Sequence, residues 1–166
     1  MMLRSVELPE GVTGHLYLHS MPGRYEKFQE ARDEIVRCKI ERVIRLASLE
    51  EVRSKSRDYA LAIEAGKLPW IEEAFAVPDF DAPKGKDLPR FLELAKNVAN
   101  HLINGKNILI HCGAGIGRTG TLAICILIIL GMRTEQAKAV VQDARSRPEG
   151  ESQKQVIEWV AQHAMK

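Results

Sequence analysis

The fold is decided by residues 110–120, which read Ile-His-Cys-Gly-Ala-Gly-Ile-Gly-Arg-Thr-Gly. Residues 107–111 form a short apolar stretch typical of a buried strand, and an apolar helix pattern follows the loop as far as Gly131. The three glycines between Cys112 and Arg118 let the backbone turn tightly between these two elements. We therefore predict a strand, a glycine-rich loop and a long apolar helix, in that order.

The backbone of this loop is suited to holding an anion. A helix N-terminus presents unpaired N–H groups and the positive end of the helix dipole. Successive N–H groups of a tight turn can converge on one oxyanion of the size of phosphate. The predicted phosphate-binding residues are Gly113, Ala114, Gly115, Ile116, Gly117 and Arg118.

The side chains around the loop predict nucleophilic catalysis. Helix N-termini and neighbouring cations favour the thiolate form of cysteine, so we expect Cys112 to be a thiolate at neutral pH that can attack phosphorus. Arg118 offers a planar fork that matches two phosphate oxygens. Thr119 is placed to hydrogen-bond the sulfur as a leaving group, and we expect His111 to orient the loop and to favour the thiolate.

The order His-Cys-x-x-Gly-x-x-Arg-Thr at residues 111–119 resembles the signature of the protein tyrosine phosphatase superfamily. The short chain is similar to the compact, dual-specificity-like branch of that superfamily. The resemblance implies a two-step reaction through a phosphocysteine, with no metal and no cofactor. It also implies that the substrate is a phosphorylated protein or peptide. Phosphotyrosine is the expected substrate residue, and hydrolysis of phosphoserine or phosphothreonine stays open. Affinity for the anions phosphate, sulfate and vanadate is implied as well.

A phosphatase of this kind needs a proton donor on a mobile loop. Residues 77–83 read Val-Pro-Asp-Phe-Asp-Ala-Pro and resemble the acid loop of the family, which is usually Trp-Pro-Asp. Asp79 matches the aspartate of that motif, with Val77 in place of the usual tryptophan, and Asp81 is the rival. Asp79 is therefore the expected general acid.

Members of the family also carry a late glutamine that positions the hydrolytic water. The stretch that begins at Arg147-Pro148 resembles that region with its spacing altered, and Gln153 and Gln155 are the candidates. Gln155 is preferred, because it follows Glu151 and Ser152 much as the family's glutamine follows an acidic–hydroxyl pair.

The rest of the chain alternates between strand and helix patterns. Strands are expected at residues 14–19, 43–46, 69–77 and 107–111, and helices at 25–38, from 48, at 58–65, 88–103, 134–144 and 152–165. Ser48 with Glu51 three residues later predicts a capping box. This alternation predicts an α/β fold: a single phosphatase domain over residues 1–166, with a central, mainly parallel sheet flanked by helices on both faces.

The composition excludes several classes of protein. The chain has 166 residues, of which 45% are hydrophobic and 28% charged, which suits one folded domain. A formal charge of +2 without basic clusters makes nucleic acid an unfavoured partner. No apolar run approaches the roughly 20 residues that cross a bilayer, so no membrane partner is expected. The 3 cysteines are widely separated, which fits neither a disulfide framework nor a zinc site and favours the reducing cytoplasm.

Two other functions stay open. The same chemistry could act on a phosphoinositide or inositol phosphate, but such charged substrates favour Lys or Arg inside the loop, and residues 113, 114, 116 and 117 supply none. An inactive phosphate-binding module would have lost one of Cys112, Arg118 and Asp79, and all three are present. The sequence also leaves open whether Cys125 is a redox partner for an oxidised Cys112.

Overall fold

The computed structural model describes residues 2–164 and has an α/β architecture. In chain order the elements are β1 (Arg4–Val6), β2 (His15–His19), α1 (Phe28–Arg37), β3 (Arg42–Arg45), α2 (Leu49–Lys55), α3 (Arg57–Glu64), β4 (Ile71–Ala74), α4 (Asp87–Ile103), β5 (Asn107–His111), α5 (Gly117–Ile129), α6 (Thr134–Asp143) and α7 (Glu151–His163).

The strands form one sheet in the order β1-β2-β5-β3-β4. Strands β2, β5, β3 and β4 run parallel, and β1 pairs antiparallel with β2 at the edge. This confirms the predicted mainly parallel sheet. Although β5 is the last strand in the chain, it lies between β2 and β3. Its carboxyl end is therefore at a switch point of the topology, where open α/β sheets bind ligands.

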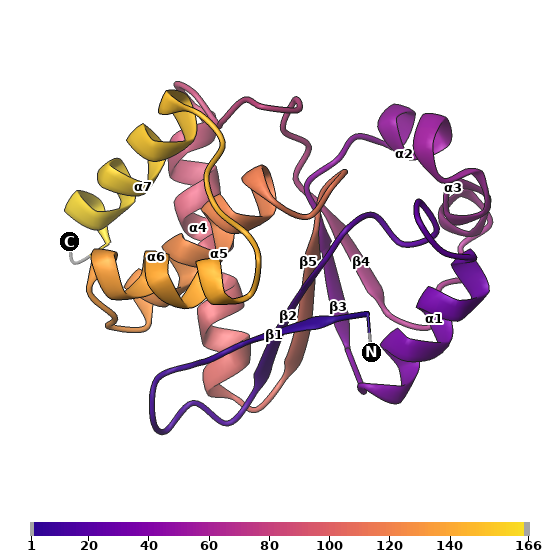
Figure 1. Cartoon of the computed structure of the whole chain (residues 1–166), viewed down its shortest axis with the longest axis horizontal. Helices are drawn as coiled ribbons and strands as arrows, with labels where there is room; N and C mark the ends of the chain where they lie inside the picture. Colours follow the sequence, from indigo (N-terminus) through magenta and orange to yellow (C-terminus); the bar gives the residue numbers. More distant parts are fainter. Residues whose placement is uncertain (1, 165–166) are drawn as a thin grey trace.

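Helices cover both faces of the sheet, as predicted. Figure 1 shows α4, α5, α6 and α7 on one side and α1, α2 and α3 on the other. The strands contribute side chains to two hydrophobic cores, one on each face of the sheet, because successive side chains point to opposite faces. In β5, Ile108 and Ile110 belong to the core beneath the four later helices, whereas Leu109 belongs to the core beneath the three earlier ones.

Helix α5 is the centre of the larger core. Its residues from Leu122 to Leu127 are fully buried, and α4, α6 and α7 pack around it. A helix that is apolar on every side belongs in such a position. Cys125 lies in this segment, where burial raises the pKa of its thiol. Among the helices that the structure describes, none combines the length and the apolar character that a membrane span requires.

The structure differs from the expected elements in a few places. Strand β1 was not predicted, because three residues are too few to show an alternating pattern. Helix α4 begins at Asp87, one residue before the expected start at 88, so Pro89 lies in its first turn, where proline is tolerated because its missing N–H would be unpaired. Threonine is a residue type favoured at a helix cap, so Thr134 is the cap that the sequence predicts, but in the structure Arg133 is at the N-cap and Thr134 is the first residue of α6. The expected end of the last helix, at 165, lies outside the described residues.

Candidate active site

The glycine-rich loop connects the end of β5 to the start of α5, where the sequence placed it. Cys112 is the first residue after the strand, and only 2% of its surface is exposed. The Thr119 hydroxyl, from the first turn of α5, donates a hydrogen bond to the Cys112 sulfur at 3.0 Å. Within the described chain, no side chain caps the start of α5, so its first N–H groups stay available to an anion.

Outward hydrogen bonds fix two peptide groups of the loop. The Gly113 carbonyl accepts from the Met21 N–H at 3.0 Å, and the Ile116 carbonyl accepts from the N–H groups of Gly120 and Arg147 at 2.8 and 3.2 Å. In a trans peptide the carbonyl and the following N–H point in opposite directions. The amides of residues 114 and 117 are thereby turned away from these outer partners.

Glycine is required at two positions of the loop. Gly115 has a φ of +76°, and a Cβ there would lie 2.4 Å from the carbonyl oxygen of His19. A Cβ on Gly113 would lie 2.9 Å from Glu51 Oε2 and 3.1 Å from Arg118 Nη2. A side chain at 113 would therefore displace the charged groups of the site.

Arg118 is held by two segments that meet at the loop, helix α2 and the acid loop. Its guanidinium is 3% exposed and donates from Nη1 and Nη2 to the two carboxylate oxygens of Glu51, both at 2.8 Å. Nη1 also donates to the Val77 carbonyl at 2.8 Å, and Nη2 lies 3.3 Å from Asp79 Oδ1. Its buried Nε has no hydrogen-bond partner among the described residues. A buried donor without a partner costs free energy, which an anion in the loop would recover.

Glu51 and Lys55 were not among the candidate site residues. The predicted cap at Ser48 is present, because its hydroxyl accepts from the Glu51 N–H at 3.1 Å. The Glu51 carboxylate, however, does not complete a capping box, since it binds Arg118 and Lys55, the latter at 2.9 Å. Lys55 also lies 3.9 Å from Asp79 Oδ2. The signal in the sequence for this pair was the spacing of four residues, which places the opposite charges of Glu51 and Lys55 on one helix face.

The acid loop brings Asp79, and not Asp81, to the arginine. Asp79 contacts both Arg118 and Lys55, and its side chain is 45% exposed. The Asp81 carboxylate instead accepts from the Ala82 N–H at 2.8 Å and lies 3.2 Å from Lys84 Nζ. The Ala82 hydrogen bond and then Lys84 lower the pKa of Asp81, and both of these partners lie away from Arg118.

His111 belongs to a buried hydrogen-bonded chain on the other side of the loop. Its Nε2 lies 2.8 Å from the Tyr59 hydroxyl, which donates to Glu72, and its Nδ1 lies 3.2 Å from the Cys112 carbonyl. Glu72 is in turn paired with Arg45. Burial lowers the pKa of His111 to about 3. A neutral imidazole has a single N–H, which can serve the Tyr59 hydroxyl or the Cys112 carbonyl but not both, and it adds no positive charge beside the sulfur.

The structure separates the two candidate glutamines. Gln155, preferred from the sequence, lies exposed on α7 and lines a hollow with residues 82–85. Gln153 is 1% exposed; its Oε1 accepts from the Glu149 N–H at 2.7 Å and its Nε2 donates to the Asp81 carbonyl at 3.1 Å. A Cβ on Gly117 would lie 3.0 Å from Gln153 Oε1, so Gln153 is the glutamine beside the loop. The structure therefore brings Gln153, and not the preferred Gln155, beside the loop, because two positions along a helix turn a side chain to the opposite face.

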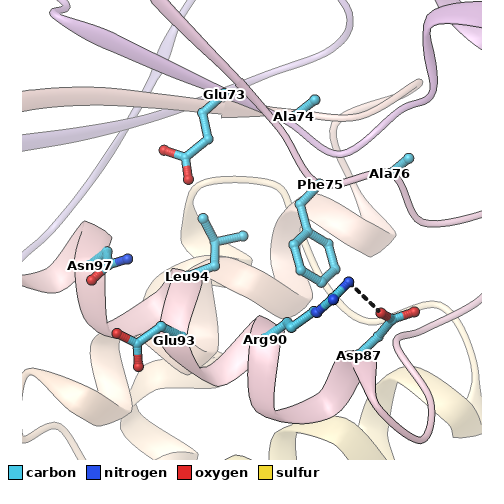
Figure 2. Close-up of a pocket in the computed structure, with 9 residues that line it drawn as sticks. All are labelled: Glu73, Ala74, Phe75, Ala76, Asp87, Arg90, Glu93, Leu94 and Asn97. Carbon is cyan, nitrogen blue, oxygen red and sulfur yellow. Dashed lines mark ion pairs between the residues drawn. The ribbon is translucent and has the colours of Figure 1, made fainter.

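A segment left out of the candidate site also contacts it. The sequence of residues 20–24, between β2 and α1, fits a turn near the pocket and a plain turn about equally well, and in the structure the Met21 N–H donates to the Gly113 carbonyl. A further hollow of about 480 Å³ lies between the end of β4 and α4, away from the loop. Figure 2 shows its lining, in which Arg90 points toward Asp87. It contains none of the candidate residues.

The chain is similar in sequence to known phosphatases. Residues 19–132 match the family described as "Tc-R-P: Polymorphic toxin system, DSP-PTPase phosphatase". A segment of 69 residues is 36% identical to mouse tyrosine-protein phosphatase non-receptor type 13. That segment covers 41% of this chain and 3% of the mouse protein, so the chain spans a small part of its relative.

Solved structures share the whole fold. Kinase associated phosphatase, with serine in place of its catalytic cysteine, is similar with a TM-score of 0.81 and 19% identity, over 98% of this chain and 95% of that one. The structure of PTPMT1 in complex with PI(5)P is similar with a TM-score of 0.72 and 18% identity, over 90% and 92% of the two chains. At these identities the likeness shows a common fold.

The Glu51–Arg118 pair predicts a loss of stability in acid. The hydrogen bond from Arg118 holds the pKa of Glu51 at about 2, below its ordinary value of 4.5. Because the folded-state pKa is the lower one, the pair stabilises the fold fully above pH 4.5 and loses this effect as the pH falls toward 2. Urea unfolding at a series of pH values should show a flatter dependence between about pH 5 and pH 2 in Glu51→Gln.

The matched control is Glu73→Gln, which removes a carboxylate paired with Arg42 at the surface. Its pH dependence should stay close to that of the native protein, because an exposed pair contributes little. An unchanged slope in Glu51→Gln would show that its pairing does not stabilise the fold.

Proposed function

The chain belongs to the DSP-PTPase phosphatase family of polymorphic toxin systems, a compact, dual-specificity-like branch of the protein tyrosine phosphatase superfamily, and we propose that it hydrolyses phosphotyrosine in proteins, with phosphoserine and phosphothreonine as further substrates. The observation that carries the proposal is the position of the Cys112 sulfur, which accepts a hydrogen bond from Thr119 at the uncapped start of α5. Arg118 lies beside it, and the buried Nε of that arginine has no hydrogen-bond partner among the described residues. The proposed unit is the whole chain as one domain, in the reducing cytoplasm.

In the proposed first step the Cys112 thiolate attacks phosphorus and forms an S–P bond. The ester P–O bond breaks, and the departing oxygen takes the proton of Asp79. The loop amides and Arg118 bind the phosphoryl oxygens as their charge redistributes. The contacts of Asp79 with Arg118 and Lys55 support this assignment, because they hold the carboxyl group beside the residue that binds the phosphoryl group.

In the second step water attacks phosphorus and gives a proton to the Asp79 carboxylate. The S–P bond breaks, and the Thr119 hydroxyl stabilises the departing thiolate through its 3.0 Å hydrogen bond. We assign the positioning of this water to Gln153, because it lies beside both Gly117 and the acid loop. His111 is assigned the orientation of the Cys112 peptide.

The residues of the loop favour protein substrates. Between Cys112 and Arg118 there is no Lys or Arg to bind additional phosphates of an inositol polyphosphate. The structure of PTPMT1 in complex with PI(5)P supports the alternative of a phosphoinositide substrate, because that ligand is bound on the same fold. Substrate preference therefore has to be measured directly.

Phosphate release from a small aryl phosphate tests the chemistry. The native protein should be active, and Cys112→Ser should lose at least about a thousandfold in kcat, because the hydroxyl is a far weaker nucleophile than a thiolate. Cys38→Ser is the control, since Cys38 is a half-buried cysteine at the end of α1. Activity that survives in Cys112→Ser would refute the proposal. An inactive native protein with a reduced thiol would favour the phosphate-binding module.

The general acid is tested by comparing two neighbouring aspartates. Asp79→Ala should lower kcat by about a hundredfold, most strongly with poor leaving groups, while KM changes little. The native pH–rate profile should be bell-shaped, and this variant should lose the fall at high pH. Asp81→Ala should keep that fall. The reverse result would assign the acid to Asp81.

Substrate class is tested with a phosphotyrosine peptide, a phosphoserine peptide and an inositol polyphosphate. We expect kcat/KM to favour the phosphotyrosine peptide over the inositol polyphosphate by about tenfold or more, because the loop lacks extra cations. A clear preference for the inositol polyphosphate would replace protein phosphatase by the alternative.

A further inference from the structure

The carbonyl of Gly115, in the middle of the phosphate loop, is held by two side chains from distant parts of the chain. Arg4 Nη2 donates to it at 2.6 Å, and the Ser146 hydroxyl donates to it at 2.6 Å. The two side chains also contact each other, with Arg4 Nη2 3.4 Å from Ser146 Oγ. Arg4 comes from β1, and Ser146 from the connection between α6 and α7.

The antiparallel direction of β1 places Arg4 at the loop. Arg4 lies opposite Leu18 of β2, and Leu18 lies opposite Ile110 of β5. Because β1 runs against the other strands, its first residue lies at the carboxyl edge of the sheet, where the loop begins. The backbone just before Arg4 is anchored as well, since the N–H of Leu3 donates to the buried Glu34 carboxylate at 3.1 Å.

The hydrogen bonds to Gly115 set the direction of the next amide. The carbonyl of Gly115 and the N–H of Ile116 belong to one peptide plane and point in opposite directions. Glycine alone does not fix this plane, because it adopts many backbone conformations at similar free energy. With the carbonyl held outward, the Ile116 N–H is turned to the opposite side, in the same sense as the amides of residues 114 and 117.

This anchor differs from the two others in the loop. The carbonyls of Gly113 and Ile116 are held by backbone N–H groups, which no substitution removes directly. The Gly115 carbonyl depends on side chains, one of which carries a permanent positive charge within electrostatic reach of Cys112. A guanidinium hydrogen-bonded to a carbonyl also makes the attached N–H a stronger donor, because hydrogen bonds along a peptide polarise one another.

We infer that Arg4, together with Ser146, is a positioning residue of the phosphate site: it turns the Ile116 amide toward the bound phosphoryl group and adds positive charge beside it. The inference rests on the proposed function. It assigns part of the phosphate affinity to an edge strand that precedes the signature by more than one hundred residues, since Arg4 and Gly115 are 111 positions apart.

The test compares phosphate binding and catalysis in Arg4→Ala, Arg4→Lys and Ser146→Ala. Calorimetry with inorganic phosphate should show a Kd raised about tenfold in Arg4→Ala, about threefold in Ser146→Ala, and by an intermediate factor in Arg4→Lys, which keeps the charge. With an aryl phosphate, kcat/KM should fall in the same order, and the inhibition constant for vanadate should rise with it.

Arg42→Ala is the matched control, because Arg42 is paired with Glu73 and lies at the opposite end of the sheet. It should change the phosphate Kd by less than about twofold. If Arg4→Ala fails to fold, Arg4→Lys and Ser146→Ala carry the comparison. The inference would be overturned if every variant that folds binds phosphate with a Kd within twofold of the native value, even where its Tm is lower. Arg4 would then stabilise the position of β1 and have no role in phosphate binding.

Binding and turnover separate this inference from the proposed function. If the native protein binds phosphate but hydrolyses no phosphate ester, the proposed function fails, and the Kd series still decides the role of Arg4. If the native protein is an active phosphatase and the Kd series is flat, only the inference about Arg4 fails.

Discussion

The pairing of Arg118 with Glu51 is the contact on which the geometry of the site depends. It joins the first turn of α5 to α2, and the Val77 carbonyl and Asp79 bring the acid loop to the same guanidinium. Because both terminal nitrogens of Arg118 are occupied by the protein, the fork is oriented before any ligand arrives. Such pre-orientation reduces the entropy lost on binding. The glycine-rich loop, the loop at residues 77–83 and α2 therefore take their relative positions from one buried cation.

Much of this arrangement could be predicted from the sequence, because the determinants were local. The apolar strand at 107–111, the three glycines of the loop and the apolar helix after them identified β5, the loop and α5 without any distant information. The alternation of strands and helices gave the sheet class. The pair Asp79 and Asp81 was left as a choice, and only the three-dimensional contacts with Arg118 and Lys55 distinguish the two.

The features that the sequence did not reveal are long-range. Glu51 was explained by its helix cap, and a local explanation hid its contact with an arginine 67 positions away. Gln153 and Gln155 differ only in helix face, and the start of α7 could not be placed accurately enough to choose. Strand β1 is too short for a pattern, yet it delivers Arg4 to the loop. Arg4, Glu51 and Gln153 each contact a partner far away in the chain.

The anchoring of Gly115 from both β1 and the segment before α7 has a consequence for folding during synthesis. Closing loops of 111 and 31 residues around one carbonyl costs chain entropy and gives the site a high contact order. A nascent chain whose residue 146 is still inside the ribosome can form the β2–β5 pairing but cannot complete this clamp. The clamp around the Gly115 carbonyl can therefore close only after residue 146 has left the ribosome, when most of the sheet has already formed, and until then Cys112 lies in an unfinished loop.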